Sequence, residues 1–156
     1  ILSGRRRRRS RPSSYNRRVN PDLPRLRHFI RSTLGCGCPD ETLQWIECSH
    51  SHGDPAHDLR LTRIDVGGRL LVYVIESDLG PDAAAAAVPA VVASGLVERA
   101  RGGFNRLRIV VAGSDPEALR PLATAHFASS APCDDRVHLH VVAVEDLPFA
   151  RESDGQ

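Results

Sequence analysis

The order of apolar patterns between residues 59 and 148 constrains the fold of this chain more than any other feature. Residues 61–66 alternate between apolar and polar side chains, and residues 70–75 form a continuous apolar run. These are the patterns of a half-buried strand and of a fully buried strand. Gly67 and Gly68, which lie between them, favour a tight hairpin turn. The two segments therefore predict an antiparallel pair of strands.

Helical and strand patterns then alternate towards the C-terminus. Residues 82–101 carry apolar side chains at helical spacing, and Pro89 is expected to kink this helix or to mark its first turn. Strands are predicted over residues 107–112 and 137–144, with a helix over residues 116–130 between them. This β-β-α-β-α-β order implies right-handed crossovers and parallel pairing of the last three strands. We therefore predict an α/β domain with a mixed, mostly parallel sheet and helices packed on it.

An N-terminal helical hairpin is predicted to precede the sheet. Its first helix is indicated by apolar side chains at helical spacing, namely Leu23, Leu26, Ile30 and Leu34. Gly35 fits the left-handed position that ends a helix. A second helix is predicted over residues 39–48, followed by a polar loop. We thus expect one domain over residues 21–150, with a helical Cys/His segment at 21–58 and a sheet core at 59–148.

Charge separates the first 20 residues from the rest of the chain. All 21 basic residues are arginine, and eight of them lie in residues 1–20, which contain no acid. The remaining 13 arginines face 19 Asp and Glu residues, a net charge of −6 (13 − 19). We expect residues 1–20 and 151–156 to be disordered. Because the chain begins with Ile1 and contains no Met, we also expect native translation to start near Val19.

The same composition limits the classes of partner and location. An acidic domain lacks the basic patch that specific nucleic-acid binding requires, so none is predicted for the domain. No apolar run approaches the roughly 20 residues of a membrane span, so none is predicted. A cytoplasmic location follows from the lack of a secretory signal pattern. The use of Arg without Lys, together with abundant Ala, suggests a GC-rich bacterial genome.

The sharpest chemical motif is Cys36-Gly37-Cys38-Pro39, directly after the first predicted helix. Two cysteines one residue apart can bind one metal ion or close a small disulfide. If the second helix begins at Pro39, Cys38 lies at its N-cap, where backbone N–H groups and the helix dipole favour a thiolate. We therefore predict that Cys38 is the more reactive sulfur and Cys36 its partner. A structural turn with buried thiols is the alternative.

Cysteines and histidines of the same segment are candidate ligands for zinc or iron. The candidates are Cys36, Cys38, Cys48, His50, His52 and His57. A continuous helix would separate Cys38 from Cys48 by about 15 Å, whereas a Zn–S bond measures about 2.3 Å. The six residues are therefore not expected to share one site. A solvated polar loop is the alternative for the three histidines.

Carboxylates at the predicted strand ends form a rival site. Glu76, Asp78, Asp115 and Asp146 follow three strands whose carboxyl ends meet at one edge of the sheet. Such a group could hold Mg²⁺. However, Asp115-Pro116-Glu117 is also an ordinary helix start, with Asp115 as the N-cap. No Gly-rich phosphate loop accompanies these carboxylates, so capping is the favoured interpretation of Asp115.

The segment from Phe29 through Leu34-Gly35-Cys36-Gly37-Cys38-Pro39 to Cys48 resembles the opening of a group of small uncharacterised bacterial proteins. In that group a helix, an LGCxCP turn, a second helix and a third cysteine follow one another. The resemblance covers about the first third of the folded chain and implies no activity.

The function predicted from the sequence is a small protein with a thiol-redox or metal-binding centre at the Cys-Gly-Cys-Pro turn. The alternative is a non-catalytic interaction or accessory subunit that has structural cysteines and a protein partner. A weaker alternative is a carboxylate-based, Mg²⁺-dependent enzyme. Whether the protein is an enzyme is left open by the residues alone.

Overall fold

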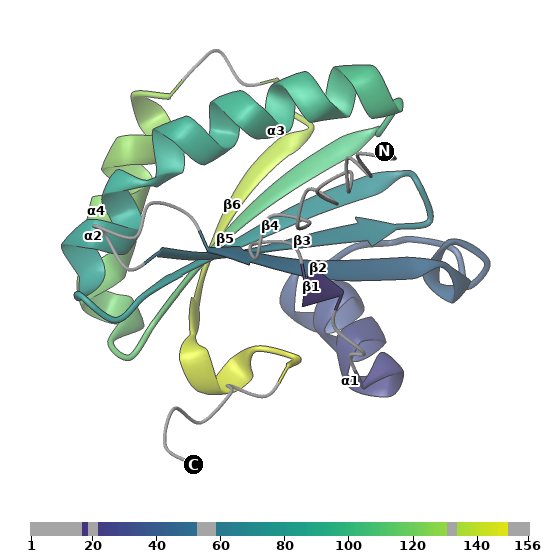
Figure 1. The fold of residues 1–156 in the computed structure, drawn as a ribbon, viewed down its shortest axis with the longest axis horizontal. Helices are drawn as coiled ribbons and strands as arrows, with labels where there is room; N and C mark the ends of the chain where they lie inside the picture. The colour runs from purple at the N-terminus through teal and green to yellow at the C-terminus, as the bar shows by residue number, and fades with distance from the viewer. Residues whose placement is uncertain (1–16, 19–21, 53–58, 131–133, 150–156) are drawn as a thin grey trace, which may run out of the picture.

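A computed structural model describes residues 17–18, 22–52, 59–130 and 134–149, which form an α/β fold around one mixed sheet. The strands are β1 (Arg17–Arg18), β2 (Ile46–His52), β3 (Leu59–Val66), β4 (Leu70–Ser77), β5 (Arg106–Gly113) and β6 (Val137–Ala143). The helices are α1 (Leu23–His28), α2 (Pro81–Ala86), α3 (Val88–Gly102) and α4 (Pro116–Ala128). α1 lies on one face of the sheet, and α3 and α4 lie on the other (Figure 1).

The strands follow one another across the sheet in chain order, from β1 to β6. β1 to β4 pair antiparallel, whereas β4, β5 and β6 pair parallel. The predicted hairpin and the predicted parallel pairing are thus confirmed. Gly67 and Gly68 both have positive φ in the β3–β4 turn, and the Gly68 N–H donates to Asp65 Oδ1 at 2.8 Å. Both features suit the tight turn that the Gly-Gly pair predicts.

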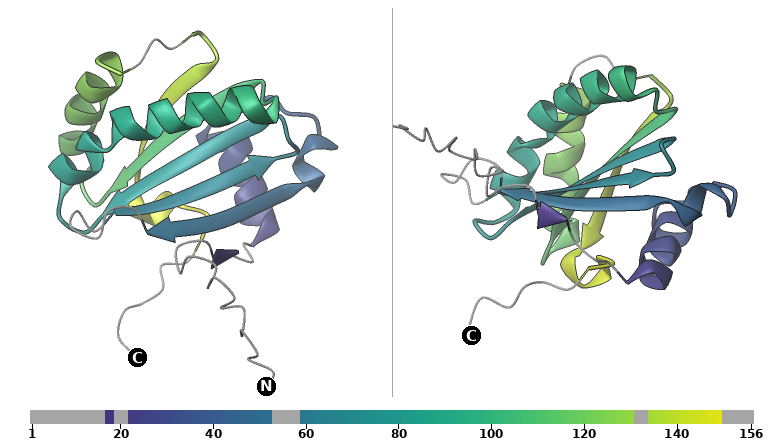
Figure 2. Two further views of the ribbon diagram at one scale, coloured as in Figure 1. Left: turned by 45° about the horizontal axis from the view of Figure 1, so that its top comes forward. Right: turned by 45° about the vertical axis from the view of Figure 1, so that its right-hand side comes forward.

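Each face of the sheet carries its own hydrophobic core. α2, α3 and α4 cover residues such as Leu71, Ile109 and Val111 on one face. α1 and the turn after it cover Val72 and Val110 on the other face (Figure 2). β4 and β5 are buried on both faces, because helices pack on either side of them. Their continuous apolar sequences reflect this double burial.

The helical segment between β4 and β5 is divided near its first proline. α2 ends at Ala86, and Pro89 lies in the first turn of α3, which is one of its two predicted places. Pro81–Gly102 is long and apolar enough to cross a membrane by length and composition. In this fold Ala84, Val88 and Val92 of that segment are buried in the core on the sheet. Core helices of this kind pass the same test, so it is weak evidence for a span.

The N-terminal helical hairpin is not confirmed. α1 is followed by a π-helical turn, Phe29–Thr33, and Gly35 has the predicted positive φ of 66°. In place of the second helix, residues 39–48 contain one 3₁₀ turn, Thr42–Gln44, and the start of β2. The prediction of a polar loop that begins at residue 49 is likewise wrong for residues 49–52, which belong to β2. Residues 46–52 pair with β3 along their whole length, and this pairing outweighs local helical preference.

Some predicted features fall outside the described residues. Of the tail over residues 1–20, only Arg17 and Arg18 are described, and they pair with His50 and Ser49 of β2. The candidate ligand His57 and residues 151–156 also lie outside the described ranges, as does the fourth cysteine, Cys133.

Candidate functional site at the Cys36–Cys38 turn

Cys36 and Cys38 form a disulfide in the connection between α1 and β2, with their Cα atoms 5.4 Å apart. The π-helical turn leads directly into this connection, and the Cys36 N–H donates to the carbonyl of Ile30 at 3.1 Å. Gly35 supplies the left-handed backbone that turns the chain away from the helix. Cys36 is 8% exposed and belongs to the core, whereas Cys38 is half-buried. Cys38 is therefore the more accessible sulfur.

The predicted reason for Cys38 reactivity is wrong. Because residues 39–48 do not form a helix, Cys38 does not lie at a helix N-cap, and Glu41 precedes the short 3₁₀ turn instead. A helix dipole therefore cannot stabilise a Cys38 thiolate. The 15 Å separation of Cys38 from Cys48, which assumed the same helix, does not apply either. Any stabilisation of a thiolate must come from other groups near the turn.

Arginine side chains supply positive charge beside the turn. A cavity of about 370 Å³ is lined by residues that include Cys36, Cys38, Arg69, Arg106 and Arg108, and none of its described lining residues is acidic. Arg69 directly precedes β4, and Arg106 and Arg108 lie at the start of β5. The cavity therefore lies at the amino ends of these two parallel strands. This is the opposite edge from the one predicted to carry the carboxylate site. Positive charge near a cysteine favours its thiolate.

Arg108 is the most buried of these arginines. It is 8% exposed, and its Nη1 donates to Nε2 of His140 on β6 at 2.8 Å. Burial, followed by the charge of Arg106, lowers the pKa of Arg108. Burial, together with the charges of Arg108 and His138, lowers the pKa of His140 to about 4. Because a guanidinium only donates hydrogen bonds, Nε2 of His140 accepts, and the imidazole is neutral.

This histidine predicts a specific dependence of stability on pH. Between the unfolded pKa near 6.5 and the folded pKa of about 4, the unfolded state binds a proton at residue 140 that the folded state does not. The free energy of unfolding should therefore fall by about 3 kcal/mol at most as the pH decreases through this window, less because the imidazole is partly exposed to solvent, and level off below it. His140→Gln keeps an acceptor for Arg108 without titrating, so urea unfolding at pH 7 and pH 4.5 should give a smaller difference. His28→Gln, an exposed control on α1, should leave the difference unchanged. Equal pH dependence of wild type and His140→Gln would contradict the prediction.

The remaining predicted metal ligands are spread along β2. Cys48 is 4% exposed in the core beneath α1, and burial raises its pKa to about 11. His50 Nδ1 lies 2.6 Å from Thr62 Oγ1, and its ring packs edge-on against Phe149. His52 pairs with Arg60 in the strand register. Within the described residues, no three His, Cys, Asp or Glu side chains are grouped so that they could hold a metal ion.

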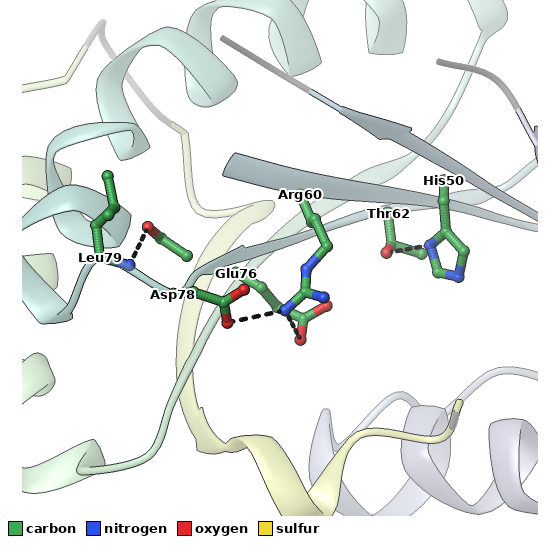
Figure 3. A network of polar contacts seen from close by, with 7 residues as sticks. His50, Arg60, Thr62, Glu76, Asp78 and Leu79 are labelled. Carbon is green, nitrogen blue, oxygen red and sulfur yellow. Dashed lines mark hydrogen bonds and ion pairs between the residues drawn. The ribbon is translucent and has the colours of Figure 1, made fainter. Parts of the chain in front are cut away.

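The carboxylates at the other edge are engaged by an arginine and by a helix end. Arg60 Nη2 lies 3.2 Å from Asp78 Oδ1 and 4.0 Å from Glu76 Oε1, so one guanidinium lies between both carboxylates (Figure 3). Asp115 Oδ1 accepts from the Ala118 N–H at 3.2 Å, which confirms the predicted N-cap of α4. Asp146 is exposed after β6. Glu76 and Asp78 thus share Arg60, Asp115 caps α4, and the four carboxylates do not form a metal-binding group within the described residues.

Sequence reasoning missed the arginines that surround the disulfide. A signal was present, because Arg106 and Arg108 alternate with apolar residues at the start of a strand that is otherwise continuously apolar. An arginine inside such a strand points to a buried polar interaction. The sequence gives no sign that this strand start lies against the Cys36–Cys38 turn, some 70 residues earlier.

Comparison of the chain with protein-family models, with curated proteins and with solved structures finds no match. The resemblance to small bacterial proteins therefore stays a prediction, and the site is interpreted from its own geometry.

Proposed function

We propose that the protein carries a thiol–disulfide exchange centre, in which Cys36 and Cys38 cycle between a dithiol and a disulfide. The observation that carries this proposal is the position of the sulfur pair: both cysteines line one cavity, together with three arginines. The half-buried Cys38 is accessible to a reaction partner, and Cys36 lies next to it as the second sulfur. Exchange requires an accessible thiolate and a resolving partner within bonding distance.

The reaction balances with a disulfide substrate, RSSR. The Cys38 thiolate attacks one sulfur of RSSR, which forms a mixed disulfide and releases one RS⁻. The Cys36 thiolate then attacks Sγ of Cys38, which closes the Cys36–Cys38 bond and releases the second RS⁻. Two electrons pass from the protein dithiol to the substrate, and each attack breaks one S–S bond as it forms another.

The location predicted from the sequence fits this cycle. In a reducing cytoplasm, where we expect the protein to reside, the glutathione pool would return the disulfide to the dithiol. Cys48 is not expected to take part, because burial raises its pKa to about 11 and holds it as the thiol. Among the three described cysteines, the reactive unit is therefore the Cys36–Cys38 pair.

The test is a redox titration of the protein in a Cys133→Ser background. After equilibration in dithiothreitol buffers of graded potential, free thiols are alkylated and counted by intact-protein mass spectrometry. We expect two thiols to appear together in a single two-electron transition. Cys38→Ser and Cys36→Ser should each abolish that transition, whereas Cys48→Ser should keep it. Thiols that remain free at every potential, or that titrate one at a time, would contradict the proposal.

Two other outcomes would favour the competing interpretations. If the anaerobically reduced protein holds about one zinc or iron ion per chain, and Cys36→Ser loses it, the turn is a metal site. If no metal is present and Cys36→Ser only lowers stability slightly, the cysteines are structural, and an interaction subunit becomes the better account. Either result would replace thiol–disulfide exchange as the function of this turn.

A further inference from the structure

Among the described residues that line the cavity beside the disulfide, all the charged side chains are positive. Arg69, Arg106 and Arg108 line it without any acidic residue among the lining side chains. None of these three arginines forms an ion pair within the part of the chain that the structure describes. Four other described arginines have carboxylate partners, whereas exposed ones such as Arg120 have none among the described residues: Arg31 pairs with Asp40, Arg60 with Glu76 and Asp78, Arg63 with Glu98, and Arg99 with Asp134. The cavity therefore concentrates positive charge that no described carboxylate neutralises.

Burial of Arg108 makes this excess of positive charge energetically unfavourable for the folded protein. The residue is 8% exposed, and its only polar partner among the described residues is His140, which is itself neutral. The Nε of Arg108 is buried and has no hydrogen-bond partner among those residues. A buried cation without a counter-charge is unfavourable, and an anion that reaches it recovers part of the lost solvation energy. The unpaired donor thus points to a ligand with negatively charged oxygen atoms.

The dimensions of the cavity suit a small molecule. Its volume of about 370 Å³ lies at the lower end of the range for small-molecule sites. Arg69 and Arg106 are exposed at its rim, whereas Arg108 is buried. An anion would therefore meet two solvated guanidinium groups first and a desolvated one inside. Because the same cavity is lined by Cys36 and Cys38, a ligand held there would lie against the disulfide.

We propose that this arginine cavity binds the acidic group of small anionic thiols and thereby selects them as the reductants of the Cys36–Cys38 disulfide. This inference rests on the proposed function and names its substrate class. A first thiolate, RS⁻, attacks Sγ of Cys38, forms a mixed disulfide and releases the Cys36 thiolate. A second RS⁻ attacks the sulfur of the bound R group, which releases the Cys38 thiolate and RSSR. Two electrons pass from two thiolates to the protein disulfide.

The test compares three thiols of similar size and different charge in the Cys133→Ser background. They are 2-mercaptoethanesulfonate, which is anionic, 2-mercaptoethanol, which is neutral, and cysteamine, which is cationic. The rate constant for reduction of the protein disulfide is measured by quenched alkylation and mass spectrometry at low ionic strength. Each rate constant is divided by the rate constant of the same thiol with bis(2-hydroxyethyl) disulfide, which removes differences in thiol reactivity.

We expect the normalised rate constant to be about tenfold higher for the anionic thiol than for the cationic one, with the neutral thiol between them. High salt should weaken this order by screening. Arg69→Gln/Arg106→Gln should abolish most of the preference, and both residues are exposed, so the variant should fold. Arg120→Gln removes one exposed arginine of α4, outside the residues that line this cavity, and should keep the preference.

The possible failures can be told apart. Equal normalised rate constants for all three thiols would overturn the anion selectivity and leave thiol–disulfide exchange intact. A preference that persists unchanged in Arg69→Gln/Arg106→Gln would also overturn it, because the selectivity would then not come from the cavity. If no thiol reduces the disulfide in the folded protein, both the inference and the proposed function are wrong.

Discussion

Replacing Phe29 by alanine is expected to lower the free energy of unfolding by about 3 to 5 kcal/mol. Phe29 is 2% exposed and belongs to the core between the N-terminal helical segment and the sheet. Its removal would leave a cavity where α1 passes into the turn that carries Cys36. Phe29→Leu, which keeps most of the apolar contact, should cost about 1 to 1.5 kcal/mol.

The measurement is equilibrium urea unfolding of Phe29→Ala and of a matched surface variant. Val97 of α3 is 51% exposed, so Val97→Ala should change the free energy of unfolding by less than about 0.5 kcal/mol. A loss below about 1 kcal/mol in Phe29→Ala would mean that α1 does not pack on the sheet as described. The slope against urea should stay the same if the variant still unfolds in one step.

Gly67→Ala is expected to destabilise the protein by about 2 to 4 kcal/mol, because two penalties combine at this position. Gly67 has a φ of 60°, which an L-residue adopts only at a cost. A Cβ there would also lie 2.6 Å from the carbonyl oxygen of Thr42, so backbone must shift to relieve the clash. Thr42 lies in the 3₁₀ turn that follows Cys38, and the substitution therefore strains the candidate site as well as the hairpin.

Gly68 provides the matched control for that substitution. It lies in the same turn with a φ of 68°, but a Cβ at this position meets nothing within 4 Å. Gly68→Ala should therefore lose only the conformational cost, about 1 kcal/mol. Thermal or urea unfolding of both variants measures the difference, which isolates the contact between the hairpin and the cysteine segment. Equal losses in the two variants would show that this contact contributes nothing.

The fold prediction succeeded for the elements whose structure depends mainly on residues close together in the sequence. The parallel strands β4 and β5 are buried on both faces, so each of them has a continuous run of apolar residues in the sequence. The helix start at Asp115 was recognised because capping needs only residues three positions apart. β2 was missed because its residues, from Ile46 to His52, combine weak strand formers with two histidines. Their strand conformation comes from pairing with residues of β3 that lie 8 (His52 and Arg60) to 20 (Ile46 and Val66) positions further along the chain.

The candidate site shows the same division. The Cys-Gly-Cys-Pro motif pointed to paired sulfurs, since two cysteines one residue apart can reach each other where the chain turns, as they do here. The source of positive charge was wrongly assigned to a helix dipole. It lies instead in Arg69, Arg106 and Arg108, which only the sheet brings to the turn. Likewise, only the pairing of β5 with β6 makes Arg108 a hydrogen-bond partner of His140.

The sequence by itself determined the order of strands and helices after residue 59, the hairpin at Gly67-Gly68 and the two cysteines one residue apart, because each depends on neighbours within a few residues. Only the tertiary structure decided that residues 46–52 extend the sheet and that the cysteine turn lies at the amino ends of β4 and β5. It also decided that Arg108 is buried without a carboxylate partner among the described residues. The physical reason is that strand pairing, burial and charge balance are set by groups far apart in the chain, whose proximity exists only after folding.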